Sequence, residues 1–328
     1  MTQNQPNKIA VIRLSSLGDI LLTTPVIRTL KQKYPNSEID FIVKEQYKDT
    51  VKFNPNISNI IVYDSGNVNS IKDEIKNNRY DLIIDLQNNF RSRTLIKNSA
   101  AEIKRFHKPT VKKFLLVRFK INLMRELKTI PQMYAEAADV QLDGNGLDLF
   151  IPDNIEPQIE KGKSYIGLCP GSKHFTKCWS QEYFIDLGNS LMSKGLDVAV
   201  IGGKDDINVC ANVSDQIKGS INLCNENNLF QTAANIKQCK AVVCNDSGLM
   251  HATSAVGIPI IAIFGSTVKE FGFVPYHVSN LILENKSLSC RPCSHIGLPE
   301  CPRKHFKCMK EISPNSVLEN LLQVISIS

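Results

Sequence analysis

The sequence has no hydrophobic run long enough to cross a lipid bilayer. Of its 328 residues, 42% are hydrophobic and 22% are charged, yet no apolar run approaches the roughly 18 to 20 residues that a transmembrane helix needs. The first residues, MTQNQPNK, are polar and lead directly into a strand-like run, so no secretory signal is expected. The proportions of hydrophobic and charged residues are those of a folded protein and exclude a disordered chain. We therefore expect a globular protein in the cytoplasm.

Two common nucleotide-binding fingerprints are also missing. The stretch PGSKHFTKCW, residues 170–179, lacks the G-x-x-x-x-G-K spacing of a Walker A loop. The stretch VIGGKDD does not match G-x-G-x-x-G, so a dinucleotide-dependent dehydrogenase lacks its fingerprint here. There is no recognised nucleic-acid-binding motif and no interleaved aromatic platform, so no nucleic-acid partner is expected.

Cysteine, by contrast, is plentiful, with ten residues. Without an export signal, reduced thiols are expected. Four of them lie in or beside apolar runs and are interpreted as small buried hydrophobic side chains: Cys169, Cys224, Cys239 and Cys244. Another four have a spacing that would suit zinc or a cluster: Cys290, Cys293, Cys301 and Cys308. Free or redox-labile thiols are the favoured interpretation of this second group, and a structural metal is the alternative.

The positive charge of the chain is concentrated in one segment. The net charge is +7, and residues 104–128 hold nine Lys or Arg against one acid, Glu126. The same segment contains Phe114, Phe119 and several aliphatic residues. One interpretation is an ordinary amphipathic helix with a solvated face. The other is a surface for an anionic partner, such as acidic lipid head groups or a phosphorylated glycan.

Short apolar runs alternate with helical patterns along almost the whole chain. We predict strands at residues 8–14, 38–44, 60–63, 81–86, 102–105, 165–169, 197–201, 241–245 and 259–264. We predict helices at residues 18–33, 68–78, 181–194, 206–218, 229–236 and 248–256. Alternation of this kind indicates parallel sheets covered by helices on both faces. A linker rich in Gly, Pro, Asp and Asn is expected near residues 153–163, with domains at 1–155 and 156–328.

The most informative motif is VVCNDSGLMHATSAVGIPIIAIFGST in the second half. A predicted strand ends at Asn245-Asp246, and a predicted helix begins at Ser247-Gly248, so the helix N-terminus suits a phosphate or pyrophosphate. His251 can donate to a phosphate oxygen, and Asp246 can accept from sugar hydroxyls. Each residue also has a structural alternative, because Asp246 or Ser247 can cap the helix and a helical His is commonly packed. Together, at the edge of a parallel sheet, they favour a ligand site.

Three blocks of this sequence together resemble one enzyme family. They are IAVIRLSSLGDILLTTPVIRTLKQKYP, PGSKHFTKCW and NDSGLMHATSAVGIPIIAIFGST. In this order they resemble the ADP-heptose:lipopolysaccharide heptosyltransferases, glycosyltransferase family 9, over residues 9 to 317. The resemblance implies an α/β GT-B fold of two facing Rossmann-like doubly wound domains. The amino-terminal domain would bind the acceptor and the carboxy-terminal domain the nucleotide sugar.

The resemblance also implies an activity and roles for individual residues. The family's inverting reaction moves L-glycero-D-manno-heptose from ADP-heptose to the inner core of lipopolysaccharide, with chemistry regarded as metal-independent and no cofactor. The implied general base is Asp19. The implied donor-binding residues are Ser172, Lys177, Asp246, Ser247, Gly248 and His251. Arg91 and Arg93 are implied contacts of the anionic acceptor, with solvated helix residues as the alternative. We expect a monomer, peripheral at the inner face of the inner membrane.

Two questions stay open from the sequence. Ser16-x-x-Asp19 is close to a capping box, so Asp19 suits the first turn of a helix as well as a base. The motifs specify the fold and the diphosphate handling better than the sugar. A family 9 enzyme with another nucleotide sugar or acceptor, or a non-catalytic binder of nucleotide or glycan, is therefore the alternative function.

Overall fold

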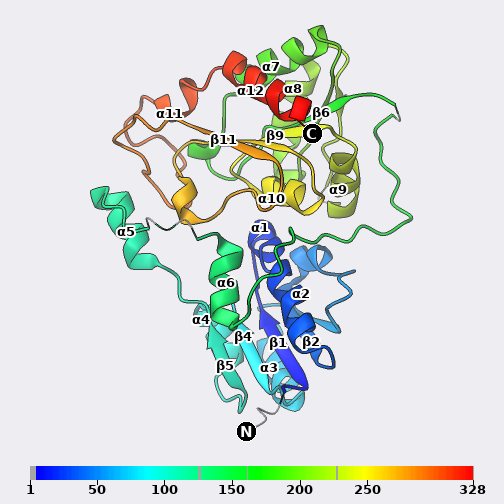
Figure 1. Ribbon diagram of the computed structural model, residues 1–328, viewed down its shortest axis with the longest axis vertical. Helices are drawn as coiled ribbons and strands as arrows, with labels where there is room; N and C mark the ends of the chain where they lie inside the picture. Colours follow the sequence, from blue (N-terminus) through cyan, green and yellow to red (C-terminus); the bar gives the residue numbers. More distant parts are fainter. Residues whose placement is uncertain (1–4, 125, 127, 161, 227, 328) are drawn as a thin grey trace. The chain divides into compact units, whose positions relative to one another are not determined.

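The computed structural model describes residues 5–124, 126, 128–160, 162–226 and 228–327 (Figure 1). Contacts divide the chain into two units. Unit 1 comprises Met1–Lys108 and Lys128–Phe150, and unit 2 comprises Pro109–Leu127 and Ile151–Ser328. The basic segment is thus shared between the units, with its central part in unit 2. Positions 125 and 127 of that segment, and position 161 of the expected linker, lie outside the described residues.

Unit 1 alternates strands and helices. Its strands are β1 (Lys8–Ile12), β2 (Glu38–Lys44), β3 (Asn59–Tyr63), β4 (Leu82–Asp85) and β5 (Glu102–Arg105). Its helices are α1 (Leu17–Leu21), α2 (Thr24–Lys33), η1 (Glu45–Thr50), α3 (Val68–Asn77), α4 (Phe90–Leu95) and α6 (Ile130–Ala138).

Unit 2 repeats the alternation with a larger sheet. Its strands are β6 (Tyr165–Cys169), β7 (Asp197–Val200), β8 (Ile221–Asn222), β9 (Ala241–Asn245), β10 (Ile260–Phe264) and β11 (Asn280–Glu284). Its longer helices are α5 (Thr110–Phe119), α7 (Gln181–Ser193), α8 (Ile207–Asp215), α9 (Leu229–Lys237), α10 (Gly248–Ala255) and α12 (Pro314–Ile327). Its short helices are η2 (Phe175–Lys177), η3 (Lys204–Asp206), η4 (Lys269–Phe271) and α11 (Lys307–Lys310).

Every strand pair in both sheets is parallel, and the strand orders are of the Rossmann type. The order is β3-β2-β1-β4-β5 in unit 1 and β11-β10-β9-β6-β7-β8 in unit 2. The direction in which strands are added reverses between β1 and β4 in unit 1, and between β6 and β9 in unit 2. At such switch points ligands bind in a crevice beyond the carboxyl ends of the strands. Each unit therefore has one topologically favoured ligand edge.

The predicted helix over residues 18–33 is wrong as a single helix, since α1 ends and α2 begins near Thr23. Pro25 lies in the first turn of α2 and has no N–H to donate to the preceding turn. The Thr24 hydroxyl donates instead to the Leu21 carbonyl oxygen at 2.8 Å, and that of Thr23 to the Ile20 carbonyl at 2.6 Å. The break separates the short helix that carries Asp19 from the longer α2.

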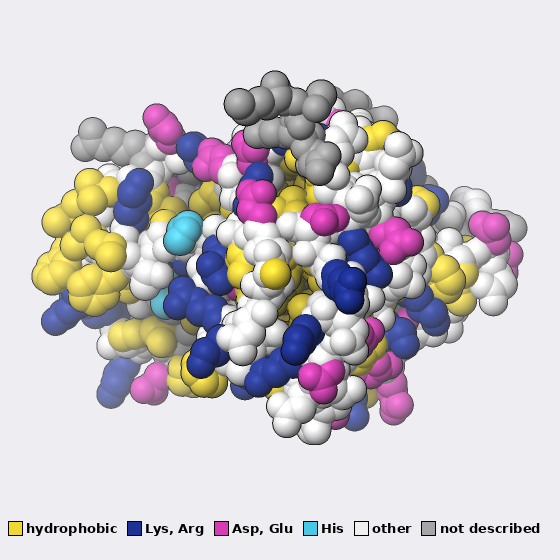
Figure 2. Space-filling model, turned by 90° about the horizontal axis from the view of Figure 1, so that it is seen from below, with side chains coloured by type: hydrophobic (Ala, Val, Ile, Leu, Met, Phe, Trp, Pro, Cys, Tyr) yellow, Lys and Arg dark blue, Asp and Glu magenta, His cyan; other side chains and the backbone are white. Residues whose placement is uncertain are grey.

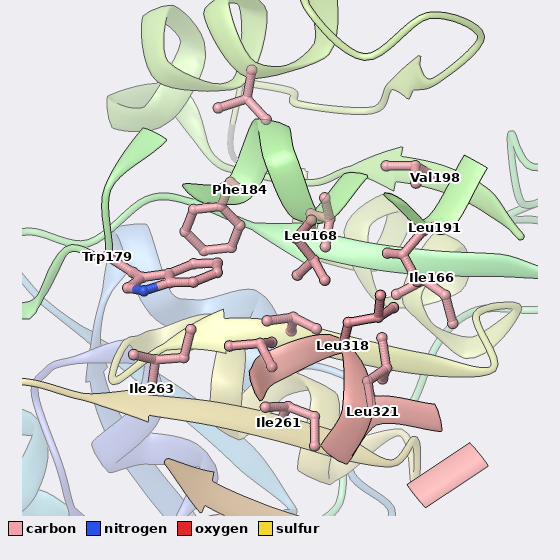
Figure 3. Close-up of a cluster of buried hydrophobic side chains, with 14 of the residues drawn as sticks. Ile166, Leu168, Trp179, Phe184, Leu191, Val198, Ile261, Ile263, Leu318 and Leu321 are labelled. Atoms are coloured by element: carbon pink, nitrogen blue, oxygen red, sulfur yellow. The ribbon is translucent and has the colours of Figure 1, made fainter. Parts of the chain in front are cut away.

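The core of unit 2 lies on both faces of its sheet, as period-two alternation along each strand requires. On one face Ile166 and Leu168 of β6 pack with Phe184 of α7 and Leu321 of α12 (Figure 3). On the other face the alternate β6 residues pack against α9 and α10. The doubly wound arrangement expected from the sequence is therefore confirmed for this unit.

All ten cysteines are free, as expected of reduced thiols. Cys169, Cys239 and Cys244 are buried in the core, which raises the pKa of Cys239 to about 12. Cys224 is only partly buried. In the described part of the chain, no helix combines the length and the apolar character needed to span a membrane.

Candidate functional site

In unit 1, Arg13 organises the ligand edge at the switch point. It follows β1 and is 6% exposed. Its Nε donates to the Ser15 carbonyl oxygen at 2.9 Å, and its Nη1 donates to the Leu86 carbonyl oxygen after β4 at 2.8 Å. The guanidinium group thereby ties together the two loops that leave β1 and β4. Arg13 was not among the predicted site residues, although a charged residue inside the apolar run of residues 8–14 was a readable signal.

Asp19 lies beside this guanidinium group. Arg13 Nη2 and Asp19 Oδ1 are 2.5 Å apart, and the Asp19 side chain is 18% exposed. The other oxygen, Oδ2, accepts from the backbone N–H of Ser16 at 3.1 Å and from the Ser16 hydroxyl at 2.7 Å. The capping contact expected of Ser16 and Asp19 is therefore present. It leaves the carboxylate partly exposed at the ligand edge, so capping and a catalytic role are compatible.

More charged groups lie near Asp19 within unit 1. Loss of water around the Lys108 ammonium group lowers the pKa of Lys108, and the charge of Arg13 lowers it further, while Asp19 and Asp85 act in the opposite direction. Asp85, at the end of β4, is fully buried, and its carboxylate accepts from the Asn88 N–H at 2.7 Å. This edge of unit 1 therefore holds opposite charges close together.

The two arginines expected to contact the acceptor lie on α4. Arg91 and Arg93 are both exposed. Arg93 Nε donates to Asn88 Oδ1 at 2.9 Å, which directs it toward the loop after β4, and its charge acts on Lys108. Both side chains are accessible to a ligand, and their role stays a prediction.

In unit 2, Asn245 joins the two strands at the switch point. It is fully buried at the end of β9. Its Nδ2 donates to the Pro170 carbonyl oxygen after β6 at 2.8 Å, and its Oδ1 accepts from the Trp179 N–H at 2.9 Å. The loop that follows β6, which carries Ser172, is thus held against the end of β9. Ser172 itself is partly exposed.

Lys177 and Asp246 form an ion pair at this edge. Lys177 Nζ and Asp246 Oδ2 are 2.8 Å apart, and the side chains are 15% and 8% exposed. The Thr267 hydroxyl, from the loop after β10, donates to the same carboxylate oxygen at 2.7 Å. Three loops therefore meet on one carboxylate. Thr267 was not among the predicted site residues, although the motif FGST ends at this position.

The start of α10 is close to this pair in sequence and adds backbone N–H donors. Ser247 caps the helix in an extended conformation, and its buried Oγ has no hydrogen-bond partner in the part of the chain that the structure describes. Gly248 begins the helix. His251 is 4% exposed, with its ring edge-on to Phe273 at 6.4 Å between centroids. His251 is thus buried beside Phe273, and its role at the donor site stays a prediction.

One glycine permits the close approach of two of these loops. A Cβ at Gly265 would lie 2.5 Å from the Thr176 carbonyl oxygen and 2.6 Å from Met309 Cε. That carbonyl accepts from the Ser266 N–H at 3.1 Å, and the hydroxyls of Thr176 and Ser266 are 2.9 Å apart. The loop after β6 and the loop after β10 can touch only because residue 265 has no side chain.

The carboxy-terminal cysteines lie near one another. Cys290 Sγ and His305 Nε2 are 3.8 Å apart, and burial raises the pKa of the Cys308 thiol to about 11, with the other three cysteines acting in the same direction. Among the described residues, no group of three or more His, Cys, Asp or Glu side chains is arranged to hold a metal ion. That these cysteines are free or redox-labile thiols and not metal ligands stays a prediction.

The chain is similar to known proteins of one enzyme family. The family profile of glycosyltransferase family 9 (heptosyltransferase) matches residues 68–303. The chain belongs to glycosyltransferase family 9. Over 322 residues it is 28% identical to the lipooligosaccharide heptosyltransferase 2 of Campylobacter jejuni, with 94% of this chain and 96% of that protein covered.

Solved structures agree with this family. A glycosyltransferase family 9 protein of Veillonella parvula superposes with a TM-score of 0.80 and 25% identity over 98% of both chains. The ADP-heptose lipopolysaccharide heptosyltransferase II of Escherichia coli has a TM-score of 0.76 and 21% identity, over 97% of this chain and 98% of that one. The fold is therefore the α/β GT-B fold, and the chain is a glycosyltransferase, as its resemblance implied.

Proposed function

We propose that this glycosyltransferase moves L-glycero-D-manno-heptose from ADP-heptose to the inner core of lipopolysaccharide, with inversion at the anomeric carbon. The relatives named as heptosyltransferases support this substrate class. The observation that carries the mechanism is the Asp19 carboxylate, partly exposed at the ligand edge of unit 1 and oriented by Arg13 and Ser16. A base must be accessible and fixed in position to be useful.

In this mechanism, an acceptor hydroxyl oxygen attacks the anomeric carbon of the donor. The new C–O bond forms as the bond from that carbon to the diphosphate of ADP breaks, and the hydroxyl proton passes to the Asp19 carboxylate. The electron pair of the broken bond leaves with ADP. A carboxylate is a weak base, so it helps most when the hydroxyl is already losing its proton in the transition state.

The groups of unit 2 are suited to the donor. Lys177 and the N-terminus of α10 supply positive charge for the leaving diphosphate, which needs such stabilisation as its negative charge grows. The Ser247 hydroxyl has no hydrogen-bond partner among the described residues and can donate to a phosphate oxygen. Asp246 can accept from sugar hydroxyls through the oxygen that neither Lys177 nor Thr267 occupies. We propose that Ser172, Gly248 and His251 line the same donor site and that no resident cofactor takes part.

The proposed acceptor would bring the enzyme to a membrane. Lipopolysaccharide core is assembled on a lipid, so we propose a monomer that works peripherally at the inner face of the inner membrane. Arg91 and Arg93, both exposed on α4, are proposed to meet its anionic groups. A donor panel of ADP-heptose and other nucleotide sugars against defined core acceptors, with ADP release as the readout, separates this function from another sugar specificity and from non-catalytic binding.

Asp19→Asn tests the base. We expect turnover to fall by about 100-fold or more, the usual contribution of a positioned base, while ADP binding stays normal because the donor groups lie in unit 2. The matched control is Asp73→Asn, which removes the charge of an exposed carboxylate on α3 and should keep the turnover of the wild type. Near-normal turnover in Asp19→Asn would remove Asp19 from the mechanism.

A further inference from the structure

Large hydrophobic side chains gather on the surface of unit 2 in and after α5. Five of the exposed large hydrophobic residues fall within thirteen positions: Val111 at 71%, Phe114 at 58%, Phe119 at 57%, Ile121 at 49% and Leu123 at 50% exposure. Single exposed hydrophobic residues are ordinary, but a contiguous group marks an interaction site. We call residues 111–123 the α5 patch.

The α5 patch is held firmly on unit 2. Leu116 and Met124 are buried against Phe271 of η4. The Lys113 ammonium group lies over the Phe271 ring, 5.6 Å from its centroid. Lys120 Nζ donates to the Pro292 carbonyl oxygen at 2.6 Å and to the Cys290 carbonyl oxygen at 3.1 Å. The hydrophobic side chains of the α5 patch are therefore exposed even though the segment itself packs against unit 2.

The outer side of α5 is apolar, so the interpretation as an ordinary amphipathic helix with a solvated face is wrong. Val111 and Phe114 are exposed, while Leu116 faces the unit, so apolar side chains lie on both sides of the helix. Phe114 and Phe119 contact each other edge to face at 6.0 Å between centroids. Figure 2 shows hydrophobic side chains together at its left, where α5 lies in Figure 1, with Lys and Arg side chains beside them.

The positive charges of the α5 patch indicate what kind of partner it binds. Lys112 and Arg118 are exposed, and neither forms an ion pair with a described residue. The sequence holds no Asp or Glu from residue 103 to residue 125. A partner must therefore be negatively charged at its surface and accept aromatic and aliphatic side chains below it. An anionic lipid bilayer has this layering, with phosphate groups over hydrocarbon.

We propose that the α5 patch is the membrane-docking surface of this enzyme, with Phe114 and Phe119 entering the hydrocarbon boundary and Lys112 and Arg118 at the lipid phosphates. This inference rests on the proposed function, because that function supplies an acceptor that lies in the membrane. Binding of the protein to lipid, however, is measured without donor or acceptor.

Co-sedimentation with vesicles tests the proposal directly. The wild-type protein should bind vesicles of phosphatidylcholine mixed with phosphatidylglycerol, and bind phosphatidylcholine vesicles weakly. Lys112→Gln/Arg118→Gln should weaken binding to the anionic vesicles by about 25-fold, since each Lys or Arg near an anionic leaflet contributes about fivefold. Val111→Ser/Phe114→Ser/Phe119→Ser should weaken it by about tenfold or more by removing the inserted apolar area.

A matched control removes the same kinds of side chain elsewhere. Lys52→Gln/Phe53→Ser changes an exposed cation over an exposed aromatic ring in unit 1 and should leave vesicle binding unchanged. Far-ultraviolet circular dichroism checks that all variants are folded. Failure of the wild-type protein to bind the anionic vesicles, or equal binding by the α5 patch variants, would overturn the proposal.

Activity separates this inference from the proposed function. On a water-soluble, deacylated acceptor the α5 patch variants should turn over as the wild type does, and on acceptor embedded in vesicles they should be about tenfold slower. An equal loss on both acceptors would show that the α5 patch contacts the acceptor glycan and would refute membrane docking. No turnover by the wild type on either acceptor, with vesicle binding intact, would refute the proposed function alone.

Discussion

Replacing Lys177 by methionine should destabilise unit 2, because it leaves the Asp246 carboxylate without its counter-charge. The two side chains are 15% and 8% exposed, and Lys177 Nζ lies 2.8 Å from Asp246 Oδ2. Methionine keeps much of the volume of lysine and removes the charge. The Thr267 hydroxyl remains as a donor to the carboxylate, so the loss is partial.

The size of the effect follows from the geometry. At 2.8 Å and an effective dielectric constant of about 20, the Coulomb attraction is about 6 kcal/mol, most of which offsets the cost of taking both charges out of water. Breaking a fully buried pair from one side costs about 3 to 5 kcal/mol. With a partly exposed lysine and a remaining hydroxyl donor, we expect about 2 kcal/mol for Lys177→Met. Asp246→Asn should cost about 1 kcal/mol, because the lysine can turn to water.

Tryptophan fluorescence during urea unfolding measures this effect in unit 2. The chain has one tryptophan, Trp179, and it is buried in the core of unit 2. The double variant Lys177→Met/Asp246→Asn should lose less stability than the sum of the single variants by about 1 kcal/mol, which is the coupling between the residues. Lys307→Met, at the exposed pair with Glu311, is the control and should change stability by less than about 0.5 kcal/mol.

Two results would refute this reasoning. If Lys177→Met unfolds at the same urea concentration as the wild type, the ion pair does not stabilise the folded state. If the two single effects simply add in the double variant, the residues act independently, and the 2.8 Å contact carries no energetic coupling.

Two further predictions concern other parts of the chain. The Arg28 guanidinium beside Asp143 holds the pKa of that carboxyl well below its usual range, with Arg28 Nε and Asp143 Oδ2 2.6 Å apart. Because the pKa of Asp143 is lower in the folded state, the carboxylate stabilises the fold at pH values above its unfolded pKa of about 4. This stabilisation is lost as the pH falls through the folded pKa. Asp143→Asn should therefore be less stable than the wild type at pH 7, and the difference should shrink toward pH 2; a constant difference would contradict the assignment. Gly265→Ala should destabilise unit 2 by about 1 to 3 kcal/mol, because its Cβ would meet the Thr176 carbonyl oxygen at 2.5 Å; unchanged urea unfolding would show that the loop moves freely.

Several strands could be predicted closely from the sequence. The predicted ranges 38–44, 102–105, 165–169 and 241–245 coincide with β2, β5, β6 and β9. Strands such as β6 and β9 are buried along their whole length. Their apolar runs therefore have the same ends as the strands, which makes the ends readable in the sequence. The edge strand β11 and helix α12 were not predicted. The apolar run of β11 is only three residues long, at positions 281–283, and four of its five residues are only partly buried.

The site could be predicted only in part. The motifs pointed to the ends of β1, β6 and β9, because those positions follow from strand boundaries alone. Arg13 and Thr267 were missed as partners of Asp19 and Asp246. Thr267 comes from a loop 21 residues away, and no spacing rule relates residues that meet only through sheet topology.

The sequence by itself determined the alternation of strands and helices, the doubly wound sheets and the family, because these depend on local periodicity and on short motifs. Only the tertiary structure decided which charges pair, where Gly265 lets two loops touch, and that the hydrophobic side chains of the α5 patch face outward. Those features depend on contacts between residues distant in the chain and on solvent exposure, and an apolar residue has the same letter whether it lies in the core or on the surface.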